Sequence, residues 1–256
     1  MNTINIILTT IILIATIYFV FFYNYKKSFS INDGLKIYFI NMTENIDRWE
    51  KNKNKLPNFH RFNAVNGKEV DIDKLRTNGI LKENEKWIGR MKPGTIGCAL
   101  SHIKVMNLIK NQQEKFGLIL EDDVMIQDNF INNLKNLEPY FPPYWDIIYL
   151  GGCNISGKKY NEKFLIPEIK SGVNFCTHAL LLNKENIHNI INILTPINRP
   201  IDQQLRENFN KIKAYYVYPS MLFQNNELES IRRVLDGQEQ KKDKLQNFVE
   251  NINIIT

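Results

Sequence analysis

The sequence is poor in the residues that build disulfide-stapled domains and zinc modules. Only three cysteines occur among its 256 residues, and no two of them stand in CxxC spacing. This pattern indicates neither a disulfide framework nor a zinc site. We therefore expect Cys98, Cys153 and Cys176 to be small buried apolar side chains, which is a common environment for free cysteines.

The sequence also lacks the marks of a nucleic-acid-binding protein. Its net charge is +6, but the lysines and arginines form no stripe interleaved with aromatic residues, and it contains no nucleic-acid-binding motif. A small anionic ligand, a membrane surface or solubility alone would account for the positive charge. We expect no nucleic acid among the partners.

The sequence contains enough apolar residues for one large hydrophobic core. The hydrophobic content is 43%, and no internal repeat divides the chain. Apolar runs typical of strands alternate with stretches typical of helices, which predicts a three-layer α/β domain with a mostly parallel sheet. Ligands of such sheets bind at the carboxyl ends of the strands.

An uncharged apolar segment precedes this domain. As a helix, residues 6–23 would span about 27 Å, close to the ~30 Å hydrocarbon core of a bilayer. Aromatic residues crowd its end and two lysines follow, whereas a cleaved signal peptide would have small residues there. We predict a transmembrane anchor at 4–23, a linker at 24–34, the α/β domain at 35–236 and a charged tail, helical or loose, at 237–256.

Short patterns predict the elements that lead to the ligand-binding edge. "KIYFIN" is predicted to be a buried first strand, and Thr43 is expected to cap the helix after it. "FHRFNAV" alternates like a strand and closes at the turn Asn66-Gly67. After an irregular loop at 71–92 and the residues "PGT", apolar residues at helical spacing predict a helix that runs to about Gln113. "WDIIYLGG" and "NFCTHALLL" are predicted to be further strands, and Asn183 can cap the helix "KENIHNIINIL".

The most informative stretch is "LILEDDV", in which an apolar strand ends in three carboxylates. Glu121, Asp122 and Asp123 have no lysine or arginine beside them in the sequence. Their mutual repulsion in a partly desolvated site would reach several kcal/mol. Carboxylate oxygens at a strand end are suitable ligands for Mn²⁺ or Mg²⁺, and a cation would turn the repulsion into binding. A solvated acidic turn is the alternative.

Three further polar residues are candidates for a site, and each also has a structural explanation. His102 lies on the predicted helix "GCALSH", where an exposed or half-buried structural histidine is the alternative. Asp202 follows Pro200 at an expected helix start, where the helix dipole stabilises a carboxylate by about 0.3–1 kcal/mol. A catalytic base at that position need only be ionised and correctly placed. Arg48 follows the first strand, where an arginine is either solvated or grips an anion.

Taken together, several blocks resemble glycosyltransferase family 25, which includes bacterial lipooligosaccharide galactosyltransferases and collagen hydroxylysine galactosyltransferases. "GCALSH" followed by "EDD" is the most specific pairing, and the resemblance covers roughly residues 36–232. The blocks, in order, are "IYFINMTENIDRWE", "RFNAVNG", "PGTIGCALSHIKVM", "LILEDDV", "WDIIYLGG", "HALLLNKENI", "PIDQQL" and "YPSMLFQ".

The resemblance implies a GT-A type, Rossmann-like fold that uses a nucleotide-sugar donor, UDP-linked, and a divalent metal. Glu121, Asp122 and Asp123 would hold Mn²⁺ or Mg²⁺ against the donor diphosphate, with Asp123 as first choice for direct ligand. The metal would act as a Lewis acid that stabilises the departing nucleoside diphosphate.

The resemblance also implies which residues line the nucleotide and which face the acceptor. This chain has Asn66 where family members often carry Asp, which removes a charge and bears on the choice of sugar donor. The family resembles inverting enzymes, so Asp202 is the candidate base for the acceptor hydroxyl, and His102 and Ser101 would orient donor or acceptor. The residues expected to line the nucleotide are Ile40, Asn41, Arg48, Ala64, Val65, Asn66 and Gly67.

We therefore expect a membrane-anchored, metal-dependent hexosyltransferase that moves galactose or glucose from a UDP-sugar to a hydroxyl of a glycan or protein. Irregular loops at 71–92 and 156–170 would meet the acceptor. The lysines after the anchor favour a cytoplasmic domain, whereas sugar-transferring enzymes of the secretory pathway usually face the lumen, so the side of the membrane stays open.

Two other classes of function stay open as well. One is a metal-dependent phosphoesterase or nucleotidyltransferase, which would usually need further carboxylates or histidines for a second metal. The chain has only four histidines in all. The other is a membrane-tethered protein that binds a sugar nucleotide without turnover.

Overall fold

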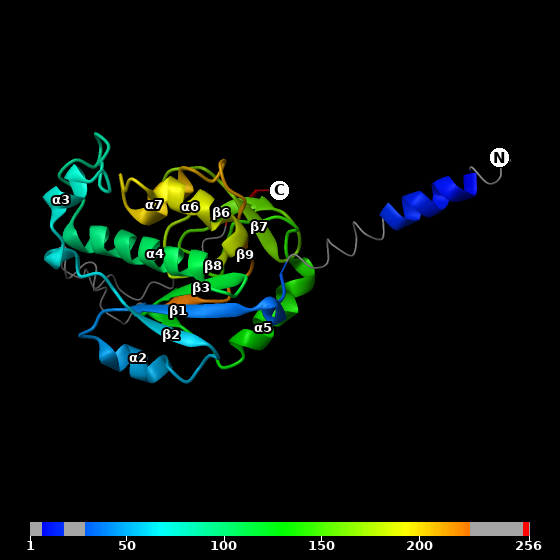
Figure 1. Ribbon diagram of the computed structural model, residues 1–256, viewed down its shortest axis with the longest axis horizontal. Helices are drawn as coiled ribbons and strands as arrows, with labels where there is room; N and C mark the ends of the chain where they lie inside the picture. The colour runs from blue at the N-terminus through cyan, green and yellow to red at the C-terminus, as the bar shows by residue number, and fades with distance from the viewer. Residues whose placement is uncertain (1–6, 18–28, 226–252, 256) are drawn as a thin grey trace.

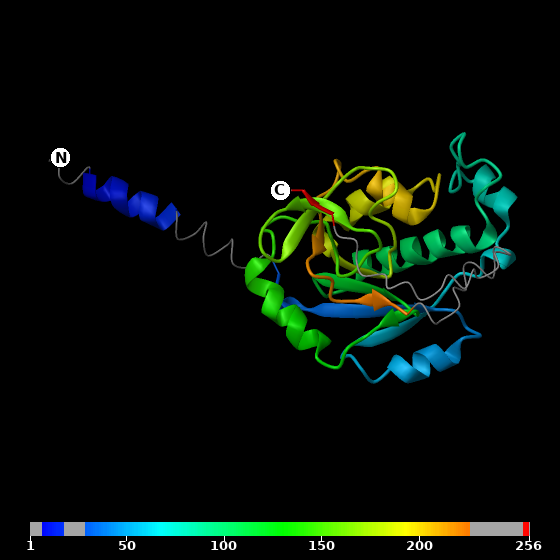
Figure 2. The ribbon, with the colours of Figure 1, turned by 180° about the vertical axis from the view of Figure 1, so that it is seen from behind.

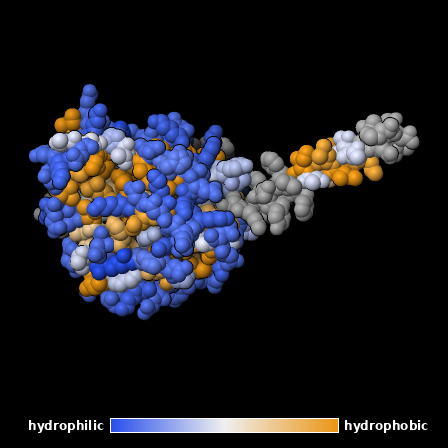
Figure 3. Space-filling view, viewed as in Figure 1, coloured by the Kyte–Doolittle hydropathy of each residue, from blue (hydrophilic) through white to orange (hydrophobic). Residues whose placement is uncertain are grey.

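The computed structural model describes residues 7–17, 29–225 and 253–255 (Figure 1). Residues 7–17 form a helix whose apolar side chains are exposed, seen as the orange rod in Figure 3. Within the described ranges, no helix is both long enough and apolar enough to cross a membrane. Residues 4–6 and 18–23 of the predicted anchor and residues 24–28 of the predicted linker lie outside these ranges, so the anchor stays a prediction.

The domain is built on one nine-stranded sheet, in the order β11-β6-β7-β9-β5-β8-β3-β1-β2. A separate two-stranded ribbon pairs β4 (Val124–Met125) with β10 (Phe223–Gln224). The strands of the large sheet are β1 (Leu35–Asn41), β2 (Phe59–Asn63), β3 (Phe116–Glu121), β5 (Ile147–Tyr149), β6 (Ser156–Lys159), β7 (Phe164–Pro167), β8 (Ala179–Asn183), β9 (Ala214–Val217) and β11 (Asn253–Ile255).

Helices cover both faces of the sheet, as predicted for three layers (Figures 1 and 2). α4, α6 and α7 lie on one face, and α2 and α5 lie on the other. The helices are α2 (Ile46–Asn52), α3 (Ile72–Thr77), α4 (Pro93–Asn111), α5 (Phe130–Leu137), α6 (Ile187–Leu194) and α7 (Ile201–Arg206), with short 3-10 turns η1 (Ile31–Asp33), η2 (Gly67–Glu69), η3 (Glu138–Tyr140) and η4 (Lys184–Asn186).

The sheet is mostly parallel in strand direction. β2, β1 and β3 run parallel to one another, and so do β5 and β9. β8 is antiparallel to both β3 and β5, which therefore point the same way. Among the described strands of the large sheet, only β7 and β8 run against the rest. The carboxyl ends of β1, β3, β5 and β9 consequently meet at one edge.

The central strands are buried on both sides, which explains their continuous apolar sequence. Leu118, Ile119 and Leu120 of β3 are fully buried. Ile119 packs in the core under α4, α6 and α7, whereas Leu118 and Leu120 pack in the core on the α5 side. Figure 3 shows that the face over α4 still presents apolar side chains amid a mostly hydrophilic surface.

Several local expectations are confirmed and several are wrong. The helix expected after "PGT" is confirmed as α4, which begins at Pro93, and the cap formed by Asn183, which accepts a hydrogen bond from the Glu185 amide, is confirmed too. α2 begins after Asn45, not after Thr43. The expected loop at 71–92 contains α3, and the loop at 156–170 contains β6 and β7, because elements of six residues or fewer show too little periodicity to be recognised.

The tail and the cysteines also differ from expectation. Residues 253–255 of the tail form β11 beside β6, and the rest of the tail lies outside the described residues. Cys153 and Cys176 form a disulfide with Cα atoms 5.6 Å apart, so the expectation of two free thiols is wrong. Such pairing depends on proximity in space, which the spacing of 23 residues does not reveal. Cys98 is a free, half-buried thiol.

Candidate functional site

The ends of β1 and β3 bring the acidic triplet beside the first-strand residues. Ile40 pairs with Glu121 across the two strands, and its side chain belongs to the core. Asn41, the last residue of β1, has a side chain that is only 1% exposed. The structure therefore places Ile40 and Asn41 beside the carboxylates, and their contact with a nucleotide stays a prediction.

Asp122 is fixed through both of its carboxylate oxygens. Asn41 Nδ2 donates to Asp122 Oδ2 at 2.8 Å, and Arg48 Nη1 donates to Asp122 Oδ1 at 2.9 Å. Arg61 Nε donates to Asn41 Oδ1 at 2.8 Å and so fixes the orientation of the amide. Burial raises the pKa of Asp122, although Arg48 and Asn41 act against this. Arg48, expected to line the nucleotide, thus grips a carboxylate of the site itself.

The half-buried Glu121 pairs with the buried His102. Glu121 Oε1 accepts a hydrogen bond from Thr177 Oγ1 at 2.8 Å and lies 3.4 Å from His102 Nε2. Burial by itself raises the pKa of Glu121, but His102 and Thr177 outweigh it and lower this pKa to about 2. Burial likewise lowers the pKa of His102, but Cys98 and Glu121 outweigh it and raise that pKa well above its ordinary value. An ionised pair is the favoured state.

His102 occupies a different environment from the one its sequence context predicted. Its side chain is 1% exposed, not half-buried or exposed. The ring faces Glu121 on one side, while Nδ1 lies 3.0 Å from the carbonyl oxygen of Cys98 on the other. α4 packs so closely on the sheet that its inner face takes polar side chains such as His102 and Ser101 into the interior.

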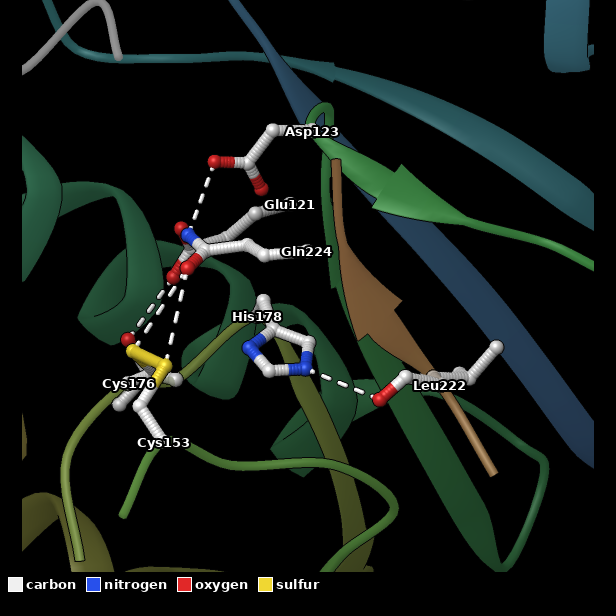
Figure 4. Close-up of a disulfide and its surroundings, with 8 residues drawn as sticks. Glu121, Asp123, Cys153, Cys176, His178, Leu222 and Gln224 are labelled. Carbon is white, nitrogen blue, oxygen red and sulfur yellow. Dashed lines mark hydrogen bonds between the residues drawn. A yellow bond between two sulfur atoms is a disulfide. The ribbon is translucent and has the colours of Figure 1, made fainter. Parts of the chain in front are cut away.

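The two carboxylate oxygens of Asp123 differ in their contacts, and Figure 4 shows the one that binds Gln224. Gln224 Nε2 donates to Asp123 Oδ2 at 2.9 Å, and the amide of Asn225 donates to the main-chain oxygen of Asp123 at 2.7 Å. Oδ1 is buried and accepts no hydrogen bond from the part of the chain that the structure describes. Burial, followed by the charges of Glu121 and Asp122, raises the pKa of Asp123 to about 7.

The three carboxylates turn towards different partners and do not converge on one point. Among the described residues, two groups of three potential metal ligands have their ligand atoms within 4.8 Å of one another. One group is Cys98, His102 and Glu121, and the other is Cys153, Cys176 and His178. The sulfurs of the second group are in the disulfide. A buried carboxylate oxygen beside two like charges, as at Asp123 Oδ1, suits a hard cation such as Mn²⁺ or Mg²⁺.

The loop at 64–67 is pressed onto the start of α4. The Val65 amide donates to Ser101 Oγ at 2.8 Å, and Ser101 Oγ donates to the Gly97 carbonyl at 2.7 Å. A Cβ at Gly97 would lie 2.5 Å from the carbonyl oxygen of Val65, and one at Gly67 would collide with the carbonyl of Pro93. Glycine at both positions thus permits the close approach that brings this loop to the end of β1.

Two predicted residues of this loop make contacts within the protein. The Ala64 amide donates to the carbonyl of Asn41 at 3.0 Å, which continues the pairing of β1 and β2. Asn66 Oδ1 accepts from the Lys68 amide at 3.1 Å, and Asn66 Nδ2 donates to Glu69 Oε1 at 2.9 Å. Asn66 therefore caps η2, a role that its sequence context did not predict.

Asp202 lies at the same edge of the sheet but is not joined to the triplet by any hydrogen bond among the described residues. It is in the first turn of α7, where its Oδ1 accepts from the Gln203 amide at 2.8 Å. Burial is the main cause that raises the pKa values of Tyr149 and Tyr216, and the charge of Asp202 raises them further. The rings of these two tyrosines, on β5 and β9, are stacked with their centres 4.4 Å apart. Tyr149 packs in the α4 core, the face on which His102 meets Glu121.

Sequence patterns missed the residues that hold the carboxylates in place. Arg61, Thr177 and Gln224 each bind a predicted site residue. Arg61 begins the block "RFNAVNG" and Gln224 ends the block "YPSMLFQ", whereas Thr177 lies one residue before "HALLLNKENI". Membership in a block was the one available signal for Arg61 and Gln224, and it did not reveal which side chain each residue contacts.

Comparisons with known proteins agree with the geometry. The family model described as "Glycosyltransferase family 25 (LPS biosynthesis protein)" matches residues 35–205. A Drosophila melanogaster "Glycosyltransferase 25 family member" is 30% identical over 131 residues, which cover 45% of this chain and 21% of that protein. The Danio rerio "Procollagen galactosyltransferase 1" is 25% identical over 161 residues, covering 58% of this chain and 26% of that protein.

Two further matches are more distant or differently described. The Bos taurus "Probable inactive glycosyltransferase 25 family member 3" is 26% identical over 153 residues, or 56% of this chain and 25% of that protein. Among solved structures, the glycosyltransferase GlyE of Streptococcus pneumoniae TIGR4 has a TM-score of 0.37 at 9% identity, covering 78% of this chain and 58% of that one, which is too weak a likeness to carry a conclusion.

The extent of the family match is what decides the classification. It covers well over half of this chain and includes β1, α4, the acidic triplet and the start of α7. The matched segments span only about a quarter of the length of the curated relatives. The chain belongs to glycosyltransferase family 25.

Proposed function

We propose that this protein transfers a hexose, galactose or glucose, from a UDP-sugar to a hydroxyl group with the help of a divalent cation. The observation that carries the proposal is Asp123 Oδ1, a buried carboxylate oxygen that accepts no hydrogen bond from the described residues and lies at the ligand-binding edge of the sheet. Membership in glycosyltransferase family 25 supplies the class of reaction.

Asp123 is the residue that would hold Mn²⁺ or Mg²⁺. When bound, the cation supplies Lewis-acid stabilisation of the leaving diphosphate. Asp122, whose two oxygens bind Asn41 and Arg48, keeps the end of β1 in place beside it. The pair between the buried His102 and the half-buried Glu121 fixes the end of β3, so we assign His102 a positioning role.

Asp202 remains the candidate base for an inverting displacement. It lies in the first turn of α7, where its Oδ1 accepts a hydrogen bond from the amide of Gln203 at 2.8 Å. An ionised carboxylate could take the proton of an acceptor hydroxyl as its oxygen attacks the anomeric carbon. The acceptor would enter between α7 and the strand ends, and the printed name of the Danio rerio relative favours galactose as the sugar.

The disulfide bears on the compartment in which the domain works. Disulfides persist in oxidising compartments and are rare in the cytosol of most cells. Together with an anchor at 4–23, Cys153–Cys176 favours a globular domain on the oxidising side of a membrane. Maleimide labelling of the denatured, unreduced full chain should modify Cys98 alone, and labelling of all three cysteines would contradict this placement.

The test of the function is metal-dependent release of UDP. The full-length protein is incubated with a set of UDP-sugars, with Mn²⁺ or with EDTA, and UDP is measured. We expect hydrolysis of one UDP-hexose that EDTA abolishes, and a loss of at least about 100-fold in Asp123→Ala, since even outer-sphere changes cost 10–100-fold.

The matched control is Asp128→Ala, because Asp128 is an exposed carboxylate a few residues after the triplet and should leave the rate unchanged. Release of phosphate in place of UDP would indicate a phosphoesterase. Equal rates with EDTA and in Asp123→Ala would overturn the metal-dependent transferase.

A further inference from the structure

The disulfide lies inside the candidate site, within contact distance of the side chain that binds Asp123. Gln224 Oε1 lies 3.7 Å from Cys153 Sγ and 3.6 Å from Cys176 Sγ. The other end of the same amide, Nε2, donates to Asp123 Oδ2 at 2.9 Å. Figure 4 shows Gln224 bridging the two sulfurs and the carboxylate.

This arrangement determines which way the amide faces. The ionised form of Asp123, which is the form that would bind a cation, can only accept hydrogen bonds, so it requires the NH₂ end of Gln224, and Oε1 then rests on the sulfurs. Disulfide sulfurs carry no hydrogen, whereas two thiols would each add a hydrogen and would no longer be held together. Reduction therefore changes both the position and the chemistry of the surface on which Oε1 rests.

Backbone hydrogen bonds hold the chain around Gln224 but do not fix its side chain. β10 pairs with the two residues of β4, the Asn225 amide donates to the Asp123 carbonyl at 2.7 Å, and the Leu222 amide donates to the Leu150 carbonyl at 3.1 Å. Within the described residues, the side-chain amide of Gln224 contacts Asp123 and the two sulfurs. The covalent disulfide next to the side chain of Gln224 thus restrains that side chain, which the local backbone pairing does not.

The disulfide also connects the cation side to the acceptor side. Cys153 and Phe175 exchange two backbone hydrogen bonds, at 2.9 and 3.0 Å. The guanidinium of Arg206 lies 5.1 Å from the centre of the Phe175 ring. Arg206 is on α7, one turn after Asp202, so both candidate functional carboxylates are tied to the same cross-link.

We propose that Gln224 is a positioning residue for Asp123 and that the Cys153–Cys176 disulfide holds Gln224 in place. The redox state of this cysteine pair then sets the affinity of the site for its cation. This inference rests on the proposed function in one respect, the role of Asp123 as a cation ligand.

The test measures Mn²⁺ affinity of the full-length protein from the decrease of the free-Mn²⁺ EPR signal. Gln224→Leu keeps the volume of the side chain and the disulfide but removes the amide, and we expect its Mn²⁺ affinity to fall about 10-fold or more, as for other residues that orient a ligand. A thermal melt without metal checks that the variant is folded.

Gln112→Leu is the matched control. Gln112 is also a buried glutamine, and it binds Tyr38 Oη at 3.0 Å and the carbonyl of Phe116 at 2.8 Å. Because Phe116 begins the strand that ends at Glu121, this control lies at the opposite end of β3. Its stability should fall while its Mn²⁺ affinity stays at the wild-type value.

A second arm tests whether the disulfide acts through Gln224. Cys153→Ala with Cys176→Ala should weaken Mn²⁺ binding several-fold, and adding Gln224→Leu should weaken it no further than Gln224→Leu alone does. If the losses of Mn²⁺ affinity multiply when the three substitutions are combined, the disulfide acts independently of Gln224, and this part of the proposal is overturned. If the alanine pair does not fold, Gln224→Leu decides.

The outcomes separate this inference from the proposed function. Wild-type affinity in Gln224→Leu overturns the inference while leaving the function intact, and a wild-type protein that binds no Mn²⁺ overturns it as well. A protein that binds Mn²⁺ with the expected pattern but releases no UDP from any UDP-sugar supports the inference and overturns the function.

Discussion

The site has two halves, and they are held together by different forces. In what we call the ionic half, Asp122 is fixed by Asn41 and Arg48, which lie in or close after the first strand. In the disulfide half, Asp123 is fixed by Gln224, whose side chain rests on Cys153 and Cys176. Both oxygens of Asp122 are engaged, whereas Oδ1 of Asp123 accepts nothing from the described residues.

The difference shows how neighbouring carboxylates acquire separate tasks. A carboxylate that accepts hydrogen bonds at both oxygens is part of the scaffold, because a cation would have to displace those donors. A carboxylate held at one oxygen only is oriented and still has a lone pair to offer. The ionic half can be weakened by removing a charge, and the disulfide half by a reductant.

Breaking the disulfide should have the largest effect on stability. The link joins residues 23 apart in the sequence, and closing a loop of that length stabilises a fold by about 3 kcal/mol. Urea unfolding with and without TCEP should show this loss in the free energy of unfolding. The variant Cys153→Ala with Cys176→Ala should be insensitive to TCEP, and an unchanged wild-type curve in TCEP would contradict the pairing.

Removing the charge from the ionic half should cost somewhat less. Arg48→Met leaves Asp122 Oδ1 without its ionic partner, and the loss of a charged hydrogen bond costs about 2 kcal/mol. The double variant Arg48→Met with Asp122→Asn should recover part of this loss in urea unfolding, because no unpaired charge then remains. Strictly additive losses would show that the two side chains do not stabilise each other.

The pH dependence of stability should report on Asp123. Its pKa is about 7 in the fold against an ordinary value of 3.8, so between these values the folded protein holds a proton that the unfolded chain has released. Stability of the metal-free protein therefore falls as pH rises through this window. Glu121, with a pKa of about 2, acts in the opposite sense but only below its ordinary value of 4.5.

The measurement is a series of thermal melts of the wild-type protein and of Asp123→Asn in EDTA between pH 4.5 and 6.5. These limits are the ordinary pKa values of Glu121 and His102, so that neither group contributes to the slope between them. The variant cannot ionise at this position, so the fall should become shallower, and Asp122, whose pKa burial also raises, should retain its own part of it. Parallel profiles for the two proteins would show that Asp123 keeps an ordinary pKa.

The smallest effect is expected at Asn66, on the rim of the ionic half. Asn66→Asp restores the residue that the family often carries, but it exchanges the hydrogen bond to Glu69 for a like-charge contact at the surface. We expect a loss below about 1 kcal/mol and no change in which UDP-sugar is preferred. A switch of the preferred UDP-sugar would show that residue 66 contacts the nucleotide despite its cap.

Much of the framework could be predicted from short-range patterns. The apolar run before Glu121, the helical spacing after Pro93 and the cap at Asn183 are local features, and each is confirmed. The reversed direction of β8 could not be predicted, because "NFCTHALLL" reads the same for either direction and its pairing with β3 and β5 sets it. The small elements α3, β6 and β7 escaped because they are too short for a period to show.

The sequence by itself determined the family, the alternation of strands and helices, and the position of three carboxylates at the end of a buried strand. Only the tertiary structure decided what each carboxylate does. Asn41 and Asp122 are 81 residues apart, and Gln224 and Asp123 are 101 apart. Periodicity reports on neighbours along the chain, whereas these partners meet only when the strand ends and β10 come together. The cysteine pair follows the same reasoning, since the fold brings Cys153 to Cys176 and both to Gln224.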